Sequence, residues 1–137
     1  MKKIFVSLGK QRLYAFDGRK RVFEFRCVSG DSSHRTKVGE HTIVRKHKIY
    51  RSKKYDVQMN FAMFFYRGQA IHEAVAVDIM SEVRALIKQI GLDKADPFGS
   101  HGCIRLSSSN ARKLFGWATM RTPVIISKGK PKLPDDK

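Results

Sequence analysis

Cysteine is scarce in this 137-residue sequence, which contains only Cys27 and Cys103. No Cys-x-x-Cys pair occurs, and the histidines before residue 50 lack the spacing of metal ligands. These histidines are His34, His41 and His47. Because His72-Glu73 is not followed by a histidine three residues later, the helical zinc-protease motif is excluded as well. The sequence therefore predicts no metal site, and it contains no Gly-rich phosphate loop.

Long apolar runs are absent too. No segment approaches the roughly 18 apolar residues of a transmembrane helix. The opening segment, Met1–Leu8, is basic and then apolar, but Gly9–Arg12 ends it too early for the apolar region of a signal peptide, which needs about 7–15 residues. The sequence therefore predicts neither a membrane span nor a leader within these residues.

Acidic residues are few, since 12 Asp and Glu stand against 28 Lys and Arg, and the formal net charge is +16. The electrostatic field of such a positive charge attracts anionic partners. These include nucleic acid, an anionic envelope surface and acidic wall polymers. The basic runs 45–48 and 51–55 contain histidine and tyrosine, yet no known nucleic-acid motif accompanies them. We therefore expect an anionic wall or envelope partner and no specific nucleic acid, with a solvated basic surface as the alternative.

The pattern of the chain predicts a single domain that is mainly β with two helices. It is 42% hydrophobic, shows no internal repeat and is long enough to bury a core. Strands are expected at 13–16 and 22–29 around an Asp17-Gly18 turn, and at 42–44, 61–66, 69–74 and 123–127. Loops are expected at 31–39, at 45–60 over the site, and at 93–99.

The two expected helices lie on either side of residue 100. The first covers 79–90, with Asp78 and Gly91 as caps. Its apolar residues Ile79, Val83, Leu86, Ile87 and Ile90 share one face. The second follows the possible caps Ser107, Ser108 and Ser109, and Ala111, Leu114, Phe115 and Ala118 share its apolar face. Residues 128–137 are rich in Pro, Lys and Asp, and we expect a mobile tail there.

The most informative stretch is Ser100-His101-Gly102-Cys103-Ile104-Arg105-Leu106. A thiol near a histidine and a cation is typical of an activated nucleophile, because the thiolate is reactive and nearby positive charge favours it. Gly102 permits backbone conformations that other residues resist, and backbone N–H groups in such a turn can stabilise an oxyanion. The alternative interpretation is a buried cysteine near a surface turn.

This string resembles the active-site motif of the L,D-transpeptidase catalytic-domain family, which are bacterial cysteine enzymes that act on peptidoglycan stem peptides. The family motif is Ser/Thr-His-Gly-Cys, an apolar residue, then Arg or Asn, and residues 100–105 fill every position. Three further segments are similar to the family: Ile71-His72-Glu73, Cys27–Gly30 and Thr36–Glu40. The resemblance covers roughly Ile4 to Ser127, and only the 100–106 motif is highly specific.

Two features depart from the family pattern. Thirty residues, 73 to 102, separate His72 from Cys103, whereas about half that spacing is commonest in the family. Glu73 stands where glycine is usual. The family uses the backbone carbonyl at that position to orient the histidine, and any residue supplies a carbonyl. An inserted segment need not separate two side chains in space, because longer connections cost little closure entropy.

The resemblance implies an L,D-transpeptidase-like β-sandwich catalytic domain over residues 1–127, without a metal or organic cofactor. Cys103 would attack the carbonyl of the third stem-peptide residue, a diamino acid in the family, and release the terminal D-residue. His72 would take the thiol proton and return it to the leaving amine. His101 would shape the site or share the proton transfer.

The remaining motif residues are implied to bind the oxyanion or the substrate. Backbone N–H groups near Gly102 and Cys103 would hold the oxyanion, and Ser100 belongs to the same group of site residues. Arg105 would position the loop or the substrate carboxylate. The family resemblance also implies action in the periplasm or cell wall. Because no leader is expected within these residues, the export route stays open, and so does synthesis in the cytoplasm without a leader.

Three classes of function stay open. In the first, the acyl group passes to an amine, which is transpeptidation. In the second, the same site works chiefly as an L,D-carboxypeptidase or as an exported wall-damaging factor. In the third, the chain is a basic binding module with a decayed site, although the intact string from Ser100 to Arg105 argues against decay.

Overall fold

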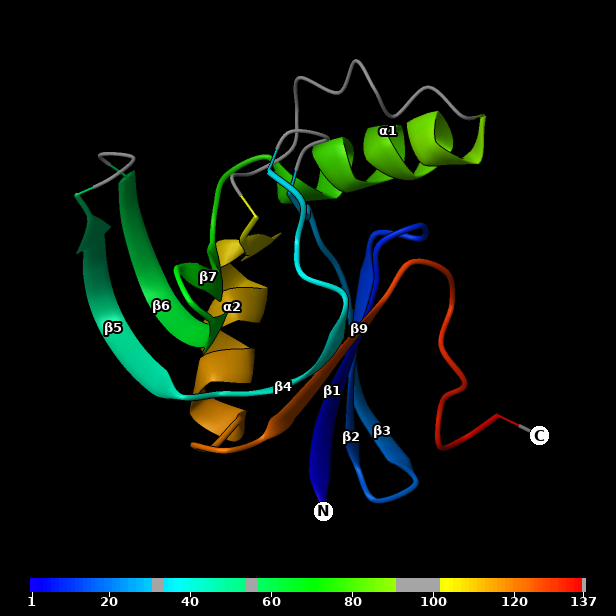
Figure 1. Cartoon of the computed structure of the whole chain (residues 1–137), viewed down its shortest axis with the longest axis horizontal. Helices are drawn as coiled ribbons and strands as arrows, with labels where there is room; N and C mark the ends of the chain where they lie inside the picture. The colour runs from blue at the N-terminus through cyan, green and yellow to red at the C-terminus, as the bar shows by residue number, and fades with distance from the viewer. Residues whose placement is uncertain (31–33, 54–56, 91–101, 137) are drawn as a thin grey trace.

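Two β-sheets and two helices make up the structure, a computed structural model that describes residues 1–30, 34–53, 57–90 and 102–136 (Figure 1). The elements are β1 (Lys2–Ser7), β2 (Arg12–Asp17), β3 (Lys20–Arg26), β4 (Gly39–Thr42), β5 (Arg45–Ser52), β6 (Val57–Tyr66), β7 (Gln69–Glu73), α1 (Val77–Gln89), β8 (Ile104–Leu106), α2 (Ser108–Trp117) and β9 (Pro123–Ser127). One sheet has the order β3-β2-β1-β9-β4 and the other β5-β6-β7-β8. The expected mainly β fold with two helices is confirmed.

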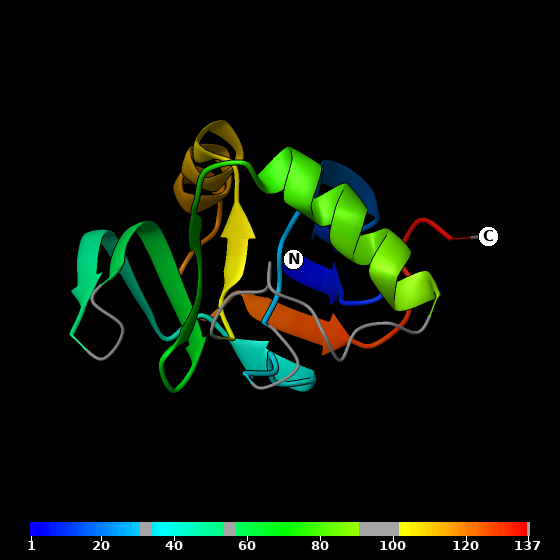
Figure 2. The same ribbon diagram turned by 90° about the horizontal axis from the view of Figure 1, so that it is seen from above.

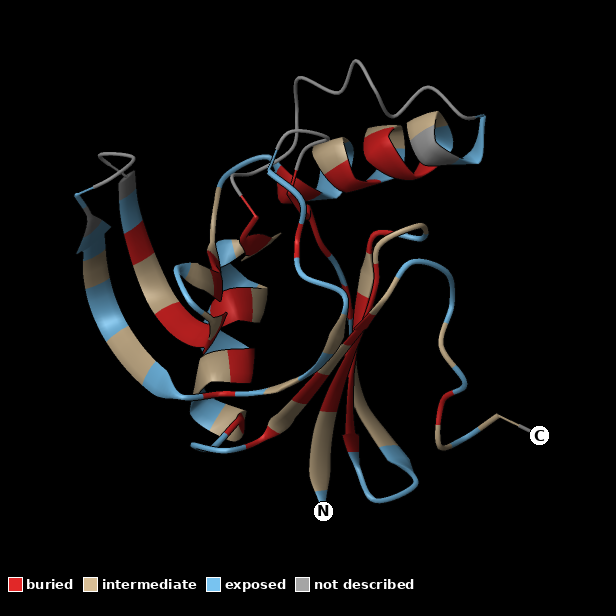
Figure 3. Cartoon of the chain, viewed as in Figure 1, coloured by how far each residue is buried: buried red, intermediate tan, exposed pale blue. Residues whose placement is uncertain are grey.

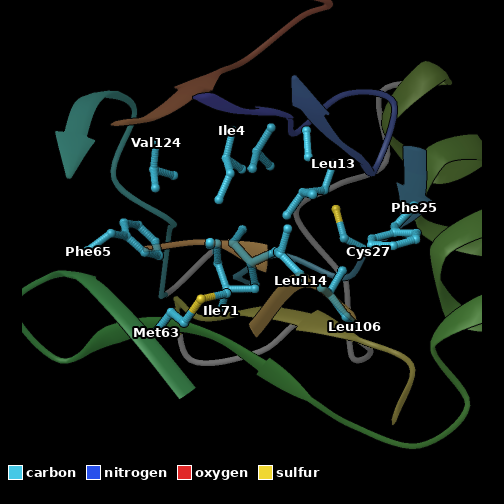
Figure 4. Close-up of a cluster of buried hydrophobic side chains, with 14 of the residues drawn as sticks. Ile4, Leu13, Phe25, Cys27, Met63, Phe65, Ile71, Leu106, Leu114 and Val124 are labelled. Atoms are coloured by element: carbon cyan, nitrogen blue, oxygen red, sulfur yellow. The ribbon is translucent and has the colours of Figure 1, made fainter. Parts of the chain in front are cut away.

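The main apolar core lies between the two sheets and includes one face of α2 (Figure 4). Its members from the two sheets and α2 include Ile4, Leu13, Val124, Met63, Ile71 and Leu114. In β1, Ile4 and Val6 face this core while Phe5 packs in a separate cluster. This alternation follows from the two-residue period of a strand, which sends successive side chains to opposite faces.

α2 forms as its sequence predicts. The Ser107 hydroxyl caps its first turn by accepting a hydrogen bond from the Asn110 N–H. Ala111 and Leu114 are fully buried against the core. The helix therefore fixes the end of β8, which precedes it by a single residue.

A short segment after β3 crosses from one sheet to the other. β3 ends at Arg26, before the expected end at residue 29. Val28 then pairs with Arg105 of β8, and each N–H donates to the other residue's carbonyl, at 3.0 and 2.8 Å. This crossing connects β8, which carries Ile104 and Arg105 of the motif, to the five-stranded sheet.

The prediction of a loop at 45–60 is wrong, because residues 45–52 form β5 and residues 57–60 begin β6. The many basic residues of this segment led to the loop prediction, although the segment forms strands. Lys48 and Arg51 are exposed, while Lys46 donates to the carbonyls of Phe115 and Ala118 at the end of α2, at 2.6 and 2.7 Å. Lysines are tolerated here because β5 is an edge strand. The strand expected at 42–44 is β4, which lies at 39–42.

α1 begins at residue 77, close to its predicted start, but most of its expected apolar stripe is exposed, and Val83 and Ile87 are half-buried (Figure 3). Ile79, Leu86 and Ile90 are 67%, 59% and 58% exposed. The opposite face, with Ser81 and Arg84, is buried. Polar contacts orient the helix, since hydrogen bonds to a charged group are worth roughly 1.5–3 kcal/mol each. Gly91 and the loop expected at 93–99 lie outside the described residues.

The C-terminal segment expected to be a mobile tail makes defined contacts with the five-stranded sheet. Leu133 is 2% exposed and packs with Phe5, Tyr14 and Phe16 on the face away from the main core. Arg21 donates to both carboxylate oxygens of Asp135, each at 2.9 Å. Within the described ranges, neither helix is long and apolar enough to cross a membrane.

These contacts make Leu133 a stabilising residue. Leu133→Ala should lower the free energy of unfolding by about 2–3 kcal/mol, because it removes buried apolar atoms and leaves a cavity. Urea unfolding measures the change. Lys132→Ala, at the exposed neighbouring position, is the control and should have no effect beyond about 0.5 kcal/mol. Equal stabilities for the two variants would show that the segment does not hold the sheet.

Candidate active site

The candidate residues lie on β7 and β8, which pair in parallel. The register sets Ile71 beside Ile104 and His72 beside Arg105. Ile71 and Ile104 belong to the main core, while Cys103 belongs to a separate cluster on the other face of the sheet. Because strand side chains alternate, His72, Cys103 and Arg105 share that other face. Figure 2 shows β8, in yellow, beside the green strand of β7.

The Cys103 thiol is nearly buried, at 8% exposed. Its sulfur accepts a hydrogen bond from the Ala70 N–H at 3.4 Å and lies 4.0 Å from the sulfur of Met59. Burial raises the pKa of the thiol, and the Ala70 N–H and the charge of Arg105 lower it less. The thiol is therefore protonated at neutral pH and needs a base to become a nucleophile.

The tautomer of His72 suits it to act as a base. Its Nδ1 lies 2.7 Å from the Glu73 carbonyl oxygen. Because a carbonyl only accepts, Nδ1 carries the hydrogen and Nε2 is the basic nitrogen of the neutral ring. Burial lowers the pKa of His72 to about 4, and the charge of Arg105 adds to this effect. The carbonyl contact that the resemblance implied at Glu73 is confirmed.

Cys27, the second cysteine, lies in a different environment. Both cysteines are free, but Cys27 is fully buried in the main core. Burial raises the pKa of its thiol to about 12. Such a thiol is inert at neutral pH, so Cys103 is the reactive candidate of the two.

Close backbone packing fixes the turn before Cys103. Gly102 has a φ of +102°, and a side chain there would place Cβ 2.6 Å from Nε2 of Gln69. The Thr36 hydroxyl donates to the Gly102 carbonyl and accepts from the Gly30 N–H, both at 2.9 Å. Glycine at 102 is therefore favoured by the backbone conformation, and a side chain there would also displace Gln69.

Sequence reasoning missed Arg84, which supports this turn from α1. Its guanidinium donates to the carbonyls of Ser29 and Gly30 at 2.6 and 2.9 Å, and to the Gln11 side chain at 2.8 Å. A Cβ on Gly30 would lie 2.8 Å from the Gly102 Cα, so the braced segment touches the motif. No pattern in the sequence distinguished this arginine from the other basic residues. The long segment between His72 and Cys103 thus contributes Arg84, a buried residue that supports this turn.

Ser100 and His101 lie outside the described residues, so their roles stay predictions. Within the described part of the chain, no group of three or more His, Cys, Asp or Glu side chains is arranged to hold a metal ion. The described arrangement comprises a protonated thiol, a neutral imidazole and a nearby guanidinium on one face of one sheet. It suits proton transfer from sulfur to imidazole and nucleophilic attack by the sulfur.

A family model described as the L,D-transpeptidase catalytic domain matches residues 1–126. The chain belongs to this family. No curated protein matches its sequence. The Ser-His-Gly-Cys-Ile-Arg string and the His72–Glu73 carbonyl contact thus occur in an L,D-transpeptidase domain.

Solved L,D-transpeptidases have the same fold. The enzyme from Stackebrandtia nassauensis has a TM-score of 0.76 at 24% identity over 95% of this chain and 57% of that one. The Mycobacterium smegmatis enzyme has a TM-score of 0.71 at 17% identity, over 92% of this chain and 58% of that one. The Enterococcus faecium enzyme has a TM-score of 0.70 at 22% identity, over 92% of this chain and 49% of that one. This L,D-transpeptidase domain therefore spans about half the length of these structures.

Burial of neutral His72 makes the stability of the domain depend on pH. Below pH 6.5 the unfolded chain binds a proton at His72 that the folded domain, with a pKa of about 4, does not bind. The free energy of unfolding should therefore fall as the pH drops from 6.5 to 4, by up to about 3 kcal/mol. His72→Gln should flatten this dependence in urea unfolding at pH 7.5, 6 and 5. His34→Gln, at an exposed histidine, should retain the pH dependence of the wild type. Equal pH dependence of the unfolding free energy in both variants would show that His72 is not its cause.

Proposed function

We propose that the chain is a cysteine L,D-transpeptidase, which forms an acyl-enzyme on Cys103 from a peptidoglycan stem peptide and passes the acyl group to an amine. The observation that carries the proposal is the placement of His72 and Cys103 on one face of paired strands. The Glu73 carbonyl contact supports it, because it leaves His72 Nε2 free to accept a proton. Family membership supplies the substrate class.

The proposed first half-reaction acylates the thiol. His72 Nε2 takes the Cys103 proton as the sulfur attacks the carbonyl carbon of the third stem residue. Backbone N–H groups near Gly102 and Cys103 stabilise the oxyanion that forms. The C–N bond then breaks, and His72 returns the proton to the leaving amine of the terminal D-residue.

The second half-reaction decides between the two catalytic classes. Capture of the acyl group by an amine gives a new peptide bond, and capture by water gives L,D-carboxypeptidase activity. Both regenerate the Cys103 thiol, so the site supports either outcome, and the same hydrolysis would serve a wall-damaging factor. A binding module without catalysis would not need the paired thiol and imidazole.

Mass spectrometry of a stem tetrapeptide incubated with the protein tests the reaction. Loss of the terminal D-residue, with a transient adduct on Cys103, is expected for the wild type. Cys103→Ala should lower turnover at least about a thousandfold, and His72→Ala by about 100- to 10,000-fold. Cys27→Ala is the matched control and should retain activity.

An adduct on Cys27, or one that persists in Cys103→Ala, would contradict the assignment of the nucleophile. His101→Ala tests the second histidine in the same assay. If iodoacetamide alkylation of the thiol keeps its pH profile in His72→Ala but shifts in His101→Ala, the base is His101.

We further propose that the excess of basic residues binds an anionic wall or envelope component, which places the reaction at the cell wall. A net charge of +16 gives attraction without sequence readout, and salt weakens it. Retention on purified peptidoglycan sacculi should therefore fall between about 50 mM and 500 mM salt. Duplex DNAs of different sequence should bind alike. Tight binding to one DNA sequence at physiological salt, without retention on sacculi, would contradict this partner.

A further inference from the structure

Arg84 of α1 is buried, at 1% exposed, and its guanidinium binds backbone carbonyls. α1 lies over the end of β3, so the side chain reaches the segment that follows this strand (Figure 1). It donates to the Ser29 carbonyl at 2.6 Å and to the Gly30 carbonyl at 2.9 Å. A charged donor makes stronger hydrogen bonds than a neutral one, and burial from water strengthens them further. Arg84 therefore polarises the peptide groups that it contacts.

The peptide group between Ser29 and Gly30 relays this polarisation to Thr36. Its carbonyl oxygen belongs to Ser29 and its N–H belongs to Gly30, and resonance joins the two in one planar unit. The Gly30 N–H donates to the Thr36 hydroxyl oxygen at 2.9 Å. Because successive hydrogen bonds polarise one another, the bond from Arg84 makes this N–H a stronger donor.

Thr36 continues the connection to the residue that carries the thiol. Its hydroxyl donates to the Gly102 carbonyl oxygen at 2.9 Å. The peptide group of that carbonyl contains the Cys103 N–H, which is one of the proposed oxyanion donors. We call these three bonds the Arg84 chain, and all of them run in one direction. Their donors and acceptors are, in order, Arg84 to Ser29, Gly30 to Thr36, and Thr36 to Gly102.

We propose that Arg84 is a positioning residue that strengthens the Cys103 N–H as an oxyanion donor through the Arg84 chain. A donor that is oriented and polarised before the reaction stabilises the developing charge without further rearrangement. This inference rests on the proposed function, because an oxyanion forms only when the Cys103 thiol attacks a carbonyl. The arginine lies in the long segment after His72, outside the motif at 100–106.

The Arg84 chain acts at the step that places negative charge on oxygen. As the Cys103 sulfur bonds to the carbonyl carbon, the thiol proton moves to His72 Nε2 and the π electron pair moves to the oxygen. The Cys103 N–H donates to that oxyanion. When the C–N bond breaks, the electron pair returns to form the thioester carbonyl, and His72 gives its proton to the leaving amine. Arg84 itself neither gains nor loses a proton.

The protonation of the thiol is controlled by other groups. Burial raises the pKa of Cys103, and the Ala70 N–H and the charge of Arg105 lower it. The Arg84 chain should therefore affect only those reactions of the thiol that pass through an oxyanion. Attack on an ester or peptide carbonyl forms one, whereas attack on iodoacetamide displaces iodide from a CH₂ carbon and forms none.

The experiment compares these reactions in variants at a temperature where urea unfolding shows each one to be folded. Intact-mass analysis measures acylation of Cys103 by 4-nitrophenyl acetate and by the stem tetrapeptide, and alkylation by iodoacetamide. Cys103→Ala corrects for acetylation of lysines. Arg84→Met should lower both acylation rates about tenfold, which is less than the roughly 100-fold loss expected when an oxyanion donor is removed outright. Alkylation should stay within about twofold of the wild type, with the same pH profile.

Thr36 tests the route. Thr36→Val removes the hydroxyl and should lower acylation as Arg84→Met does, whereas Thr36→Ser keeps the hydroxyl and should retain acylation. In the Thr36→Val background, Arg84→Met should cause no further loss, because the connection is already broken. If the two losses instead multiply in the double variant, Arg84 does not act through Thr36 and the proposal is overturned.

Ser81→Ala is the matched control on the same buried helix face. The Ser81 hydroxyl donates to the Gln11 carbonyl at 2.9 Å, so its loss weakens the docking of α1 without breaking the Arg84 chain. This variant should have a lower melting temperature and an unchanged ratio of acylation to alkylation. If Arg84→Met lowers acylation and alkylation equally, or lowers neither, Arg84 only stabilises the fold and the proposal is overturned.

The two acyl donors separate this inference from the proposed function. If 4-nitrophenyl acetate acylates Cys103 with the expected dependence on Arg84 and Thr36 but the tetrapeptide forms no adduct, the proposed substrate is wrong and the Arg84 chain is supported. If neither donor acylates Cys103 in the wild type, the nucleophile is wrong and this inference fails with it.

Discussion

The parallel pairing of β7 with β8 is the contact on which the rest of the site depends. It sets His72 beside Arg105 and places the Cys103 sulfur against the Ala70 N–H, although thirty residues separate the histidine from the cysteine. A slip of one residue would turn His72 into the core and Ile71 to the site face, because strand side chains alternate. The buried isoleucines of both strands therefore hold the chemical groups in register.

Burial then sets the protonation states. The thiol pKa is raised and that of His72 is lowered to about 4, in both cases chiefly by loss of solvent. The resting pair is therefore a neutral thiol and a neutral imidazole, not an ion pair. In the proposed reaction, charge would develop only as the sulfur attacks, where backbone N–H groups and Arg105 would stabilise it.

The long connection after His72 contributes a buried support for the turn before Cys103. α1 exposes Ile79 and Leu86 because Ser81 and Arg84 bind backbone carbonyls of the segments beneath it. Arg84 thereby braces Gly30, which touches Gly102 and so fixes the approach to Cys103. The hydrogen bonds of a buried guanidinium outweigh the exposure of Ile79 and Leu86 in this case.

Local patterns in the sequence determined much of this protein: the mainly β fold, the capped α2, the strand that carries His72, and the motif around Cys103 that identified the family. These features depend on neighbours within a few residues, so the order of residues reveals them. Only the tertiary structure decided the orientation of α1, the strand hidden in the basic run at 45–52, the docking of Leu133 and the hydrogen bonds that lead from Arg84 through Thr36 to Gly102. Each of these depends on partners distant in the chain, whose hydrogen bonds and burial override the local pattern of polarity.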